Sequence, residues 1–430
     1  MRTESAHNPD KNSLWRNRVF ARMFAAYAGA AMGEWFDAIA IQVMIVYRWG
    51  AGPVTLSWIP VVMALPGLLL GTLAGVAADR LPRIRLMLLC DLFTAAVTAA
   101  LLAAPNVGAL IPLLALRAGA AAFIAPAQQA VTRRIVPADQ LFRATTLNGL
   151  LQQSAKIAGP LIGASILAAL SPSACILIHA AMRLLSAGLL WTVRSAEPGA
   201  APDDTATSSS RAARRQSVAA EWREGLRAIV RVKPVLHTLL FGFVGLTAIL
   251  MVDYQFATLL QELAPGQPSL LGWLVASIGA GSVAVMLLLN KRGRLPYRWG
   301  LGGGYALLGA AIAGLGTLRP GVPDAAVLAL GLLLGIGNGM CIATKIALLQ
   351  QEMPADLIGR VFGVDQALTS LVMLGAPLAG GLMIEAAGAR PAFAAFGLAT
   401  AAVGLAGLLC GPALWGRSGE AGVGAVRREA

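Results

Sequence analysis

Residues 137–163 read PADQLFRATTLNGLLQQSAKIAGPLIG, and residues 354–380 read PADLIGRVFGVDQALTSLVMLGAPLAG. The two stretches share Pro-Ala-Asp, an arginine at the same place in the register and the ending Pro-Leu-x-Gly, without an insertion between these points. Each stretch joins one long apolar segment to the next. Self-similarity at about half the length of a 430-residue chain indicates a duplicated architecture made of two parallel halves.

The composition indicates that the solvent of this chain is lipid. Hydrophobic residues make up 57% and charged residues 13% of the sequence, whereas a soluble protein carries about 25% charge. A helix needs about 20 apolar residues to cross the hydrocarbon core. Apolar segments of about this length or longer lie at roughly 20–47, 54–78, 84–104, 108–131, 140–169, 173–194, 235–258, 269–290, 297–318, 325–349, 357–385 and 391–414. The sequence therefore predicts an all-α membrane protein with twelve transmembrane helices in two six-helix repeats.

Polar stretches divide these segments into domains. The predicted order is a tail at 1–19, a six-helix bundle at 20–194, a linker at 195–233, a second six-helix bundle at 234–414 and a tail at 415–430. In the linker, Ser217 is a candidate cap for a short amphipathic helix that reaches Val232. The alternative is an ordinary solvated connector.

The net charge of +13 is explained by topology and not by nucleic acid. Most of the 34 Lys and Arg residues lie in the tails and in the loops on the same side as the tails. Basic loops face the cytoplasm, so we expect both termini there, in a bacterial plasma membrane, which is the inner membrane where two are present. The expected partners are a small-molecule substrate, protons and the lipid bilayer, and the chain is expected to be monomeric.

Residues 75–83, which read GVAADRLPR, resemble the signature that the major facilitator superfamily carries between its second and third helices. Pro82 replaces the second glycine of that signature, and Ile84 occupies its last basic position. Residues 126–163, with the Pro-Ala-Asp stretch quoted above, are similar to an exporter branch that contains macrolide-efflux and enterobactin-export proteins. The resemblance implies the major facilitator fold and a cytoplasmic gate built from Gly75, Asp79, Arg80 and Arg83. The alternative for this motif is a plain charge at a helix end.

Two Pro-Gly motifs are predicted to bend helices. They comprise Gly159, Pro160 and Gly163 in the first half and Pro377 and Gly380 in the second. Proline removes a helix hydrogen bond and glycine permits close contact. The first motif resembles an antiporter signature but lacks the first glycine of that signature. Packing alone is the other explanation for both motifs.

Carboxylates inside an apolar segment are the clearest functional signal. Glu34 and Asp37 lie three residues apart and share one helix face. Buried carboxylates need a partner or a proton, and the candidate partners are Arg117, Lys156 and Arg183. We expect Glu34, Asp37 and Arg117 to couple transport to protons. A static ion-pair network is the alternative, and a structural role is also favoured for the charges of the second half: Asp253, Lys345 and Asp365.

Polar residues inside other segments are candidates for lining a substrate cavity. They are Gln128, Gln152, Lys156, Arg183, Tyr254 and Gln366. Walls of this mixed character suit bulky, partly apolar organic molecules. Hydrogen bonding between helices is the alternative for each of them.

The sequence therefore predicts a proton-coupled antiporter that exports an amphiphilic small molecule, such as a drug, a macrolide-like natural product or a siderophore. The alternatives are a lysophospholipid flippase or an uptake symporter on the same fold. An enzyme is not expected, because the H-E-x-x-H, G-x-S-x-G and G-x-x-x-x-G-K-[ST] motifs do not occur. No metal and no cofactor are predicted.

Overall fold

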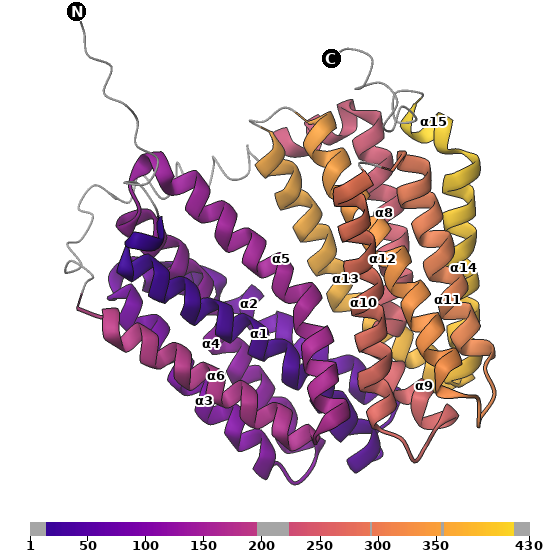
Figure 1. Cartoon of the computed structure of the whole chain (residues 1–430), viewed down its shortest axis with the longest axis horizontal. Coiled ribbons are helices and arrows are strands. Elements are labelled where there is room, and N and C mark those ends of the chain that lie inside the picture. Colours follow the sequence, from indigo (N-terminus) through magenta and orange to yellow (C-terminus); the bar gives the residue numbers. More distant parts are fainter. Residues whose placement is uncertain (1–13, 196–222, 293–294, 354–356, 417–430) are drawn as a thin grey trace, which may run out of the picture. The chain divides into compact units, whose positions relative to one another are not determined.

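The computed structural model describes residues 14–195, 223–292, 295–353 and 357–416. Every regular element in these ranges is a helix, and none of these residues lies in a β-strand (Figure 1). The chain forms two compact units. The first comprises the described residues of Met1–Ala40, Leu65–Gly159 and Leu170–Pro202, and the second those of Ile41–Ala64, Pro160–Ala169 and Asp203–Ala430. The predicted domain limits at 20–194 and 234–414 stay predictions.

Six long helices precede the linker. They are α1 (Arg18–Val43), α2 (Pro53–Arg80), α3 (Arg83–Ala100), α4 (Val107–Ile135), α5 (Ala138–Ala169) and α6 (Pro172–Val193). Three of them begin at side-chain caps, which satisfy backbone donors that the helix itself leaves free. The Asn17 side chain accepts hydrogen bonds from the Val19 and Phe20 amides at 3.1 and 3.2 Å at the start of α1. The Asn106 side chain accepts a hydrogen bond from the Ala109 amide at 3.0 Å, and the Ser171 hydroxyl accepts one from the Ala174 amide at 3.2 Å.

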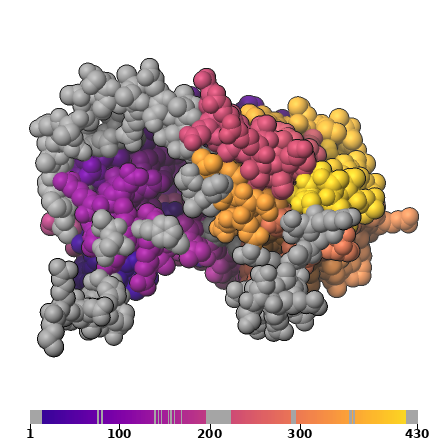
Figure 2. Space-filling model, turned by 90° about the horizontal axis from the view of Figure 1, so that it is seen from above, coloured from indigo at the N-terminus to yellow at the C-terminus, as the bar shows by residue number. Residues whose placement is uncertain are grey.

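The helices after the linker include six more long elements. They are α8 (Lys233–Asp253), α10 (Ser269–Arg292), α11 (Gly304–Thr317, continued at its start by a π-helical stretch at Arg298–Gly303), α12 (Asp324–Glu352), α13 (Ile358–Ala387) and α14 (Ala389–Leu409). Two short helices, α9 (Phe256–Leu263) and α15 (Gly411–Trp415), complete the described part. Figure 2 shows the end of the second unit where yellow α15 lies beside the start of α8, joined by a hydrogen bond from the Trp415 indole to the Thr238 hydroxyl at 2.9 Å.

The length and composition of these helices match a membrane protein. Eleven described helices are long and apolar enough to cross a bilayer. α5 is a further helix of 32 residues, so the described part contains the twelve long helices that the sequence predicts. Large apolar side chains cover their outer faces: Leu185 is 69% exposed and Leu409 is 81% exposed. Such surfaces are stable against lipid tails and costly in water.

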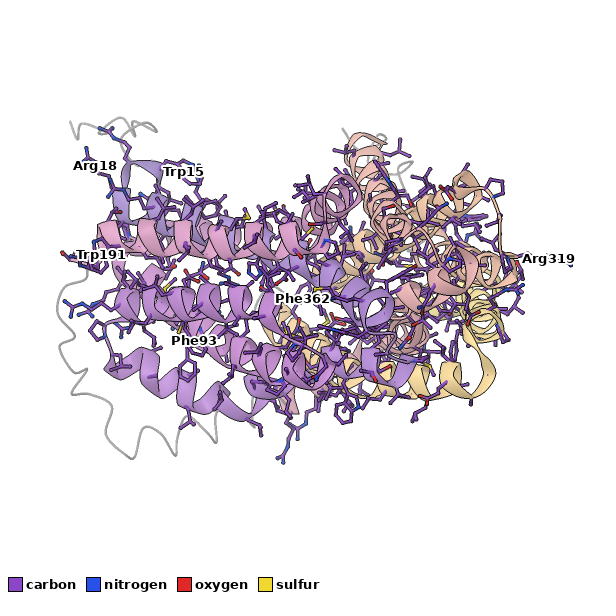
Figure 3. The ribbon with its side chains drawn as sticks, turned by 90° about the horizontal axis from the view of Figure 1, so that it is seen from below. Trp15, Arg18, Phe93, Trp191, Arg319 and Phe362 are labelled. Atoms are coloured by element: carbon purple, nitrogen blue, oxygen red, sulfur yellow. The ribbon has the colours of Figure 1, made fainter. Side chains whose placement is uncertain are left out.

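Residues at one end of the first unit have the composition of a membrane interface. Trp15, Arg18 and Trp191 lie together at this end (Figure 3). The Arg194 guanidinium carbon lies 3.4 Å from the centre of the Trp191 ring, which is a close cation–π contact. Tryptophan and arginine favour the headgroup level, so this end marks a boundary between lipid and water.

The described end of the linker is helical, while the amphipathic helix from Ser217 to Val232 stays a prediction. Residues 223–231 form helical turns in which Arg223, Arg227 and Arg231 are exposed and Ile229 is buried. Ile229 belongs to an apolar cluster with α8, α12 and α13. The proposed cap at Ser217 lies outside the described residues.

Backbone-to-backbone contact holds α11 against α14. A Cβ atom added to Gly309 would lie 2.6 Å from the Gly397 carbonyl oxygen and 2.7 Å from the Ala401 Cα. A Cβ atom on Gly404 would lie 2.5 Å from the Ala306 Cα. Small residues allow this close approach, which replaces the missing hydrophobic driving force between helices in lipid.

The substitution Gly309→Leu is expected to destabilise the second unit by at least about 1–3 kcal/mol, because its side chain forces α14 away from α11. The measurement is the thermal unfolding temperature of the purified chain in detergent. Gly375→Leu is the matched control, since no atom lies within 4 Å of a Cβ placed there. Equal unfolding temperatures for the two variants would contradict the packing argument.

Candidate functional site

A group of buried charges lies inside the first unit. Asp37 of α1 is 0% exposed, and its Oδ2 atom accepts hydrogen bonds from the guanidinium of Arg117 on α4 and from the ring of His179 on α6. The distance from His179 Nδ1 to Asp37 Oδ2 is 2.8 Å. Three helices therefore meet at one carboxylate oxygen, whereas the Oδ1 atom of Asp37 has no hydrogen-bond partner among the described residues.

The hydrogen bonds fix the protonation of His179. Arg183, one turn further along α6, donates from Nε to His179 Nε2 at 3.1 Å. Arginine has no acceptor, so His179 Nε2 must carry a lone pair. The one proton of a neutral imidazole therefore sits on Nδ1 and is donated to Asp37. In this arrangement His179 is neutral.

Asp91 of α3 extends the group. Its Oδ1 atom accepts from Arg183 Nη1 at 3.0 Å, and its Oδ2 atom accepts from the Ser186 hydroxyl at 2.5 Å. Asp91, Arg183 and Ser186 are each less than 5% exposed. Asp91 thus ties α3 to α6 at the level where Asp37 ties α1 to α4 and α6.

Glu34 connects this network to solvent-accessible space. Its carboxylate lies 3.7 Å from the guanidinium of Arg183, and its side chain is 43% exposed. Glu34 and Asp37 occupy neighbouring turns of the same face of α1, yet only Asp37 is buried. The network therefore has a closed interior and one accessible member.

The described side chains of this group contain unequal numbers of negatively and positively charged groups. Glu34, Asp37 and Asp91 supply three carboxylates, and Arg117 and Arg183 supply two guanidinium groups, among the described side chains of this group. With His179 neutral, the described side chains of this group carry one more negative charge than positive charges. We call these six residues the charge network.

Comparisons with known proteins agree with this arrangement of helices. The family model of the Major Facilitator Superfamily matches residues 23–374. The chain belongs to the major facilitator superfamily. It is 26% identical over 400 residues to YfiS of Bacillus subtilis, an uncharacterized MFS-type transporter, with 92% of this chain and 94% of YfiS covered.

A second relative has a named activity. Macrolide efflux protein A of Streptococcus pyogenes is 23% identical over 378 residues, with 85% of this chain and 88% of that protein covered. The fold also matches the crystal structure of the peptide transporter POT with a TM-score of 0.66 at 15% identity, over 97% of each chain. The major facilitator fold predicted from sequence is thereby confirmed, and the chain is a multi-pass membrane protein of the transporter type.

Of the coupling residues that the sequence predicts, the structure brings Asp37 and Arg117 into direct contact and places Glu34 beside Arg183. The side chain of the third candidate partner, Lys156, lies outside the described residues. Asp91 and His179 were missed. Asp91 is a carboxylate in the middle of an apolar segment, so the rule that selected Asp37 would also have found it.

The predicted cavity residues differ in their surroundings. Gln128 is buried, Tyr254 is half-buried, and Gln152 and Gln366 are exposed, while Arg183 belongs to the charge network. No hydrogen bond joins any two of these described side chains. Their role in binding a substrate stays a prediction.

The gate motif is only partly described. The side chains of Gly75, Asp79 and Arg80 lie outside the described residues. Arg83 donates from Nε to the Ala78 carbonyl oxygen at 2.8 Å, which closes the turn between α2 and α3. The gating role of the motif stays a prediction.

Each Pro-Gly motif lies within a continuous helix, α5 or α13. A Cβ atom on Gly159 would lie 2.6 Å from the Trp35 ring, so this glycine lets α1 and α5 approach closely. Gly380 faces the backbone of Met251 on α8, where a Cβ atom would lie 2.7 Å from the Met251 Cα. Gly163 and Pro377 are buried, and the side chain of Pro160 is not described. These contacts give the glycines a packing role, and the predicted bends stay predictions.

Removal of one member of the Asp37–Arg117 ion pair is expected to lower the stability of the chain more than removal of both members. Arg117→Met leaves the buried Asp37 without its guanidinium and should destabilise the chain by about 3–5 kcal/mol. The double variant Asp37→Leu with Arg117→Met should recover part of this loss, because no unpaired charge remains. Unfolding temperatures in detergent measure both, and exposed Arg319→Met is the control for loss of a positive charge. A double variant less stable than Arg117→Met would contradict the pairing.

Proposed function

We propose that this transporter exports an amphiphilic small molecule in exchange for protons, by alternating access of its two halves. The similarity to macrolide efflux protein A supports export of a macrolide-like compound. A drug or a siderophore-like compound is proposed on the resemblance of residues 126–163 alone. The superfamily supports alternating access, since its two parallel halves move relative to a substrate site. In this proposal the chain acts as a transporter and not as an enzyme.

The observation that carries the proton coupling is the unequal charge count of the charge network. Among the described side chains, three carboxylates face two guanidinium groups and a neutral His179, and this excess of one negative charge supports the binding of one proton. Glu34 is the accessible member and receives that proton first. A transporter that binds and releases one proton in each cycle can draw on the proton gradient without a nucleotide.

His179 links the proton to a movement. A second proton on its ring occupies Nε2, which then no longer accepts from Arg183 Nε. Arg183 loses one of its partners and is left between two carboxylates, Asp91 and Glu34. Protonation of the network therefore changes which carboxylate holds Arg183. A discrete rearrangement of this kind is what a two-state transporter needs.

The topology follows from the charges at the helix ends. We infer that both termini are cytoplasmic and that the protein lies in the bacterial plasma membrane, which is the inner membrane where two are present. The interface at Trp15, Arg18 and Trp191 supports this orientation, because arginine is retained on the cytoplasmic side (Figure 3).

Asp37→Asn is expected to lower proton-driven accumulation of the substrate at least tenfold, because a neutral amide removes the buried charge that the network must balance. The measurement is accumulation of a radiolabelled macrolide in proteoliposomes with an acidic lumen, together with substrate-induced proton release from the lumen. Glu34→Gln is expected to lower the same rates by removing the accessible carboxylate.

The control is Asp324→Asn, an exposed carboxylate in the first turn of α12, which should transport like the unmodified chain. If Asp37→Asn accumulates substrate normally against a gradient, the coupling proposal is wrong. If accumulation requires an acidic exterior instead, the protein is an uptake symporter. If only lysophospholipid moves, it is a flippase.

The orientation has its own test. A reactive tag placed at either terminus should be labelled by a membrane-impermeant reagent in inside-out vesicles and not in intact cells. Labelling of the two termini from opposite sides would overturn the twelve-helix topology as well as the orientation.

A further inference from the structure

A second group of polar side chains surrounds a pocket within the second unit. The pocket offers about 150 Å³ to water-sized molecules, and its walls come from α8, α11, α12 and α13. A cavity of about 150 Å³ is large enough to hold a benzene ring. This pocket is separate from the charge network, whose residues all belong to the first unit.

The walls of this pocket are chemically divided. α8 contributes an apolar wall that includes Leu239, Phe243 and Leu246. The other helices contribute Tyr305, Asn338 and an ion pair between Lys345 and Asp365. A predominantly apolar cavity with a few converging polar groups is the usual form of a site for a small organic ligand.

The ion pair has unused bonding capacity. Lys345 Nζ lies 3.1 Å from Asp365 Oδ1 and 2.9 Å from Asp365 Oδ2. An ammonium group has three donors and a carboxylate about four acceptor positions, so each partner can bind a further group. The two side chains are 28% and 19% exposed. The pair therefore lies neither in bulk solvent nor in a sealed interior.

Tyr305 is positioned by its packing. A Cβ atom on Gly245 would lie 2.5 Å from Tyr305 Cζ, so only glycine leaves room for the ring. Phe241 holds the same ring edge-to-face at a centroid distance of 5.3 Å. Neither the Tyr305 hydroxyl nor the Asn338 amide has a hydrogen-bond partner among the described residues. Both therefore offer free donors and acceptors to an occupant of the pocket.

We propose that this pocket binds a dipolar amphiphile, meaning a molecule whose head carries a positive and a negative group close together and whose tail is apolar. The negative group binds Lys345, the positive group binds Asp365, and the tail lies against α8. A head group with a single charge is disfavoured, because it is attracted by one member of the ion pair and repelled by the other. The repelling member lies only about twice as far from the head group as the attracting member. Coulomb energy falls inversely with distance, so about half of the attraction is cancelled.

A dipolar head avoids this loss, since each of its charges meets an opposite one and gains a charge-assisted hydrogen bond. A neutral head with hydroxyl groups gains only the weaker bonds to Tyr305 and Asn338. This assignment adds dipolar amphiphiles to the substrates of the exporter proposed above, beside macrolide-like compounds, and rests on that proposal for its role in transport. Binding itself requires no proton gradient and is tested separately.

The experiment measures binding of three probes to the purified full chain in maltoside micelles by titration calorimetry. The probes share an octyl tail and differ in the head: octyl betaine is dipolar, octyltrimethylammonium is cationic and octyl sulfate is anionic. Each is used below the concentration at which it forms micelles. Octyl betaine is expected to bind at least tenfold more tightly than the other two.

Variants locate the site. Lys345→Met and Asp365→Asn are each expected to weaken octyl betaine binding at least tenfold and to remove the preference over the charged probes. Leu246→Trp fills the pocket without changing a charge and should have the same effect on affinity, so it decides the question if the charge variants fail to fold. Tyr305→Phe should weaken binding a few-fold. Asp324→Asn, outside the pocket, should bind like the unmodified chain.

The assignment would be overturned if the unmodified chain bound the three probes with equal affinity, or if the Leu246→Trp variant bound octyl betaine as tightly as the unmodified chain does. Binding that follows these expectations in a chain that shows no proton-driven transport would remove the proposed coupling and leave the pocket assignment intact. Proton-driven export by a chain with Leu246→Trp at the normal rate would instead show that the pocket is not on the transport route.

Discussion

The cost of placing charge in a membrane is the constraint on which the first unit depends. Asp37 and Asp91 are almost completely buried, and an isolated carboxylate there is unstable. Each is retained because it accepts two hydrogen bonds, from Arg117 and His179 in one case and from Arg183 and Ser186 in the other. These bonds join α1, α3, α4 and α6. A polar group that is expensive to bury thus becomes the element that fixes how four helices pack.

The second unit is held by a different interaction. α11 and α14 meet backbone to backbone through Gly309, Gly397 and Gly404, and no charge lies in that contact. The ion pair of this unit, Lys345 with Asp365, remains partly exposed beside a pocket. The repeat in the sequence therefore preserves the connecting segments at 137–163 and 354–380 and not the charges. We propose different roles for the two units: the charge network of the first binds a proton, and the pocket of the second binds a ligand.

Much of this was readable from the sequence, for identifiable reasons. Segment lengths and apolar composition determine the helices. Asp37 needs a cationic partner in lipid, and the sequence offers three candidates, Arg117, Lys156 and Arg183; the structure pairs it with Arg117. The role of His179 was not readable, since it depends on a tautomer that Arg183 imposes through a hydrogen bond in three dimensions. The pocket was not readable either. It exists because Gly245 leaves room for a ring from Tyr305, sixty positions along the chain, and no periodicity marks such a pair.

The two buried carboxylates of the charge network, Asp37 and Asp91, have unequal surroundings. Asp91 binds Arg183 and Ser186 with both of its oxygens and is fully paired. Asp37 uses one oxygen for both of its partners and leaves the other without a partner among the described residues. Asp91 can therefore hold Arg183 while Glu34, the accessible carboxylate beside the same guanidinium, accepts the proton in the proposed cycle. If Asp37 took the proton instead, it would release Arg117 and His179 together, and the contacts that join α1 to α4 and α6 would be lost. In the proposed cycle, a proton on Glu34 shifts the partners of Arg183 while Asp91 and the other helix contacts stay in place, which is the property that a reversible cycle requires.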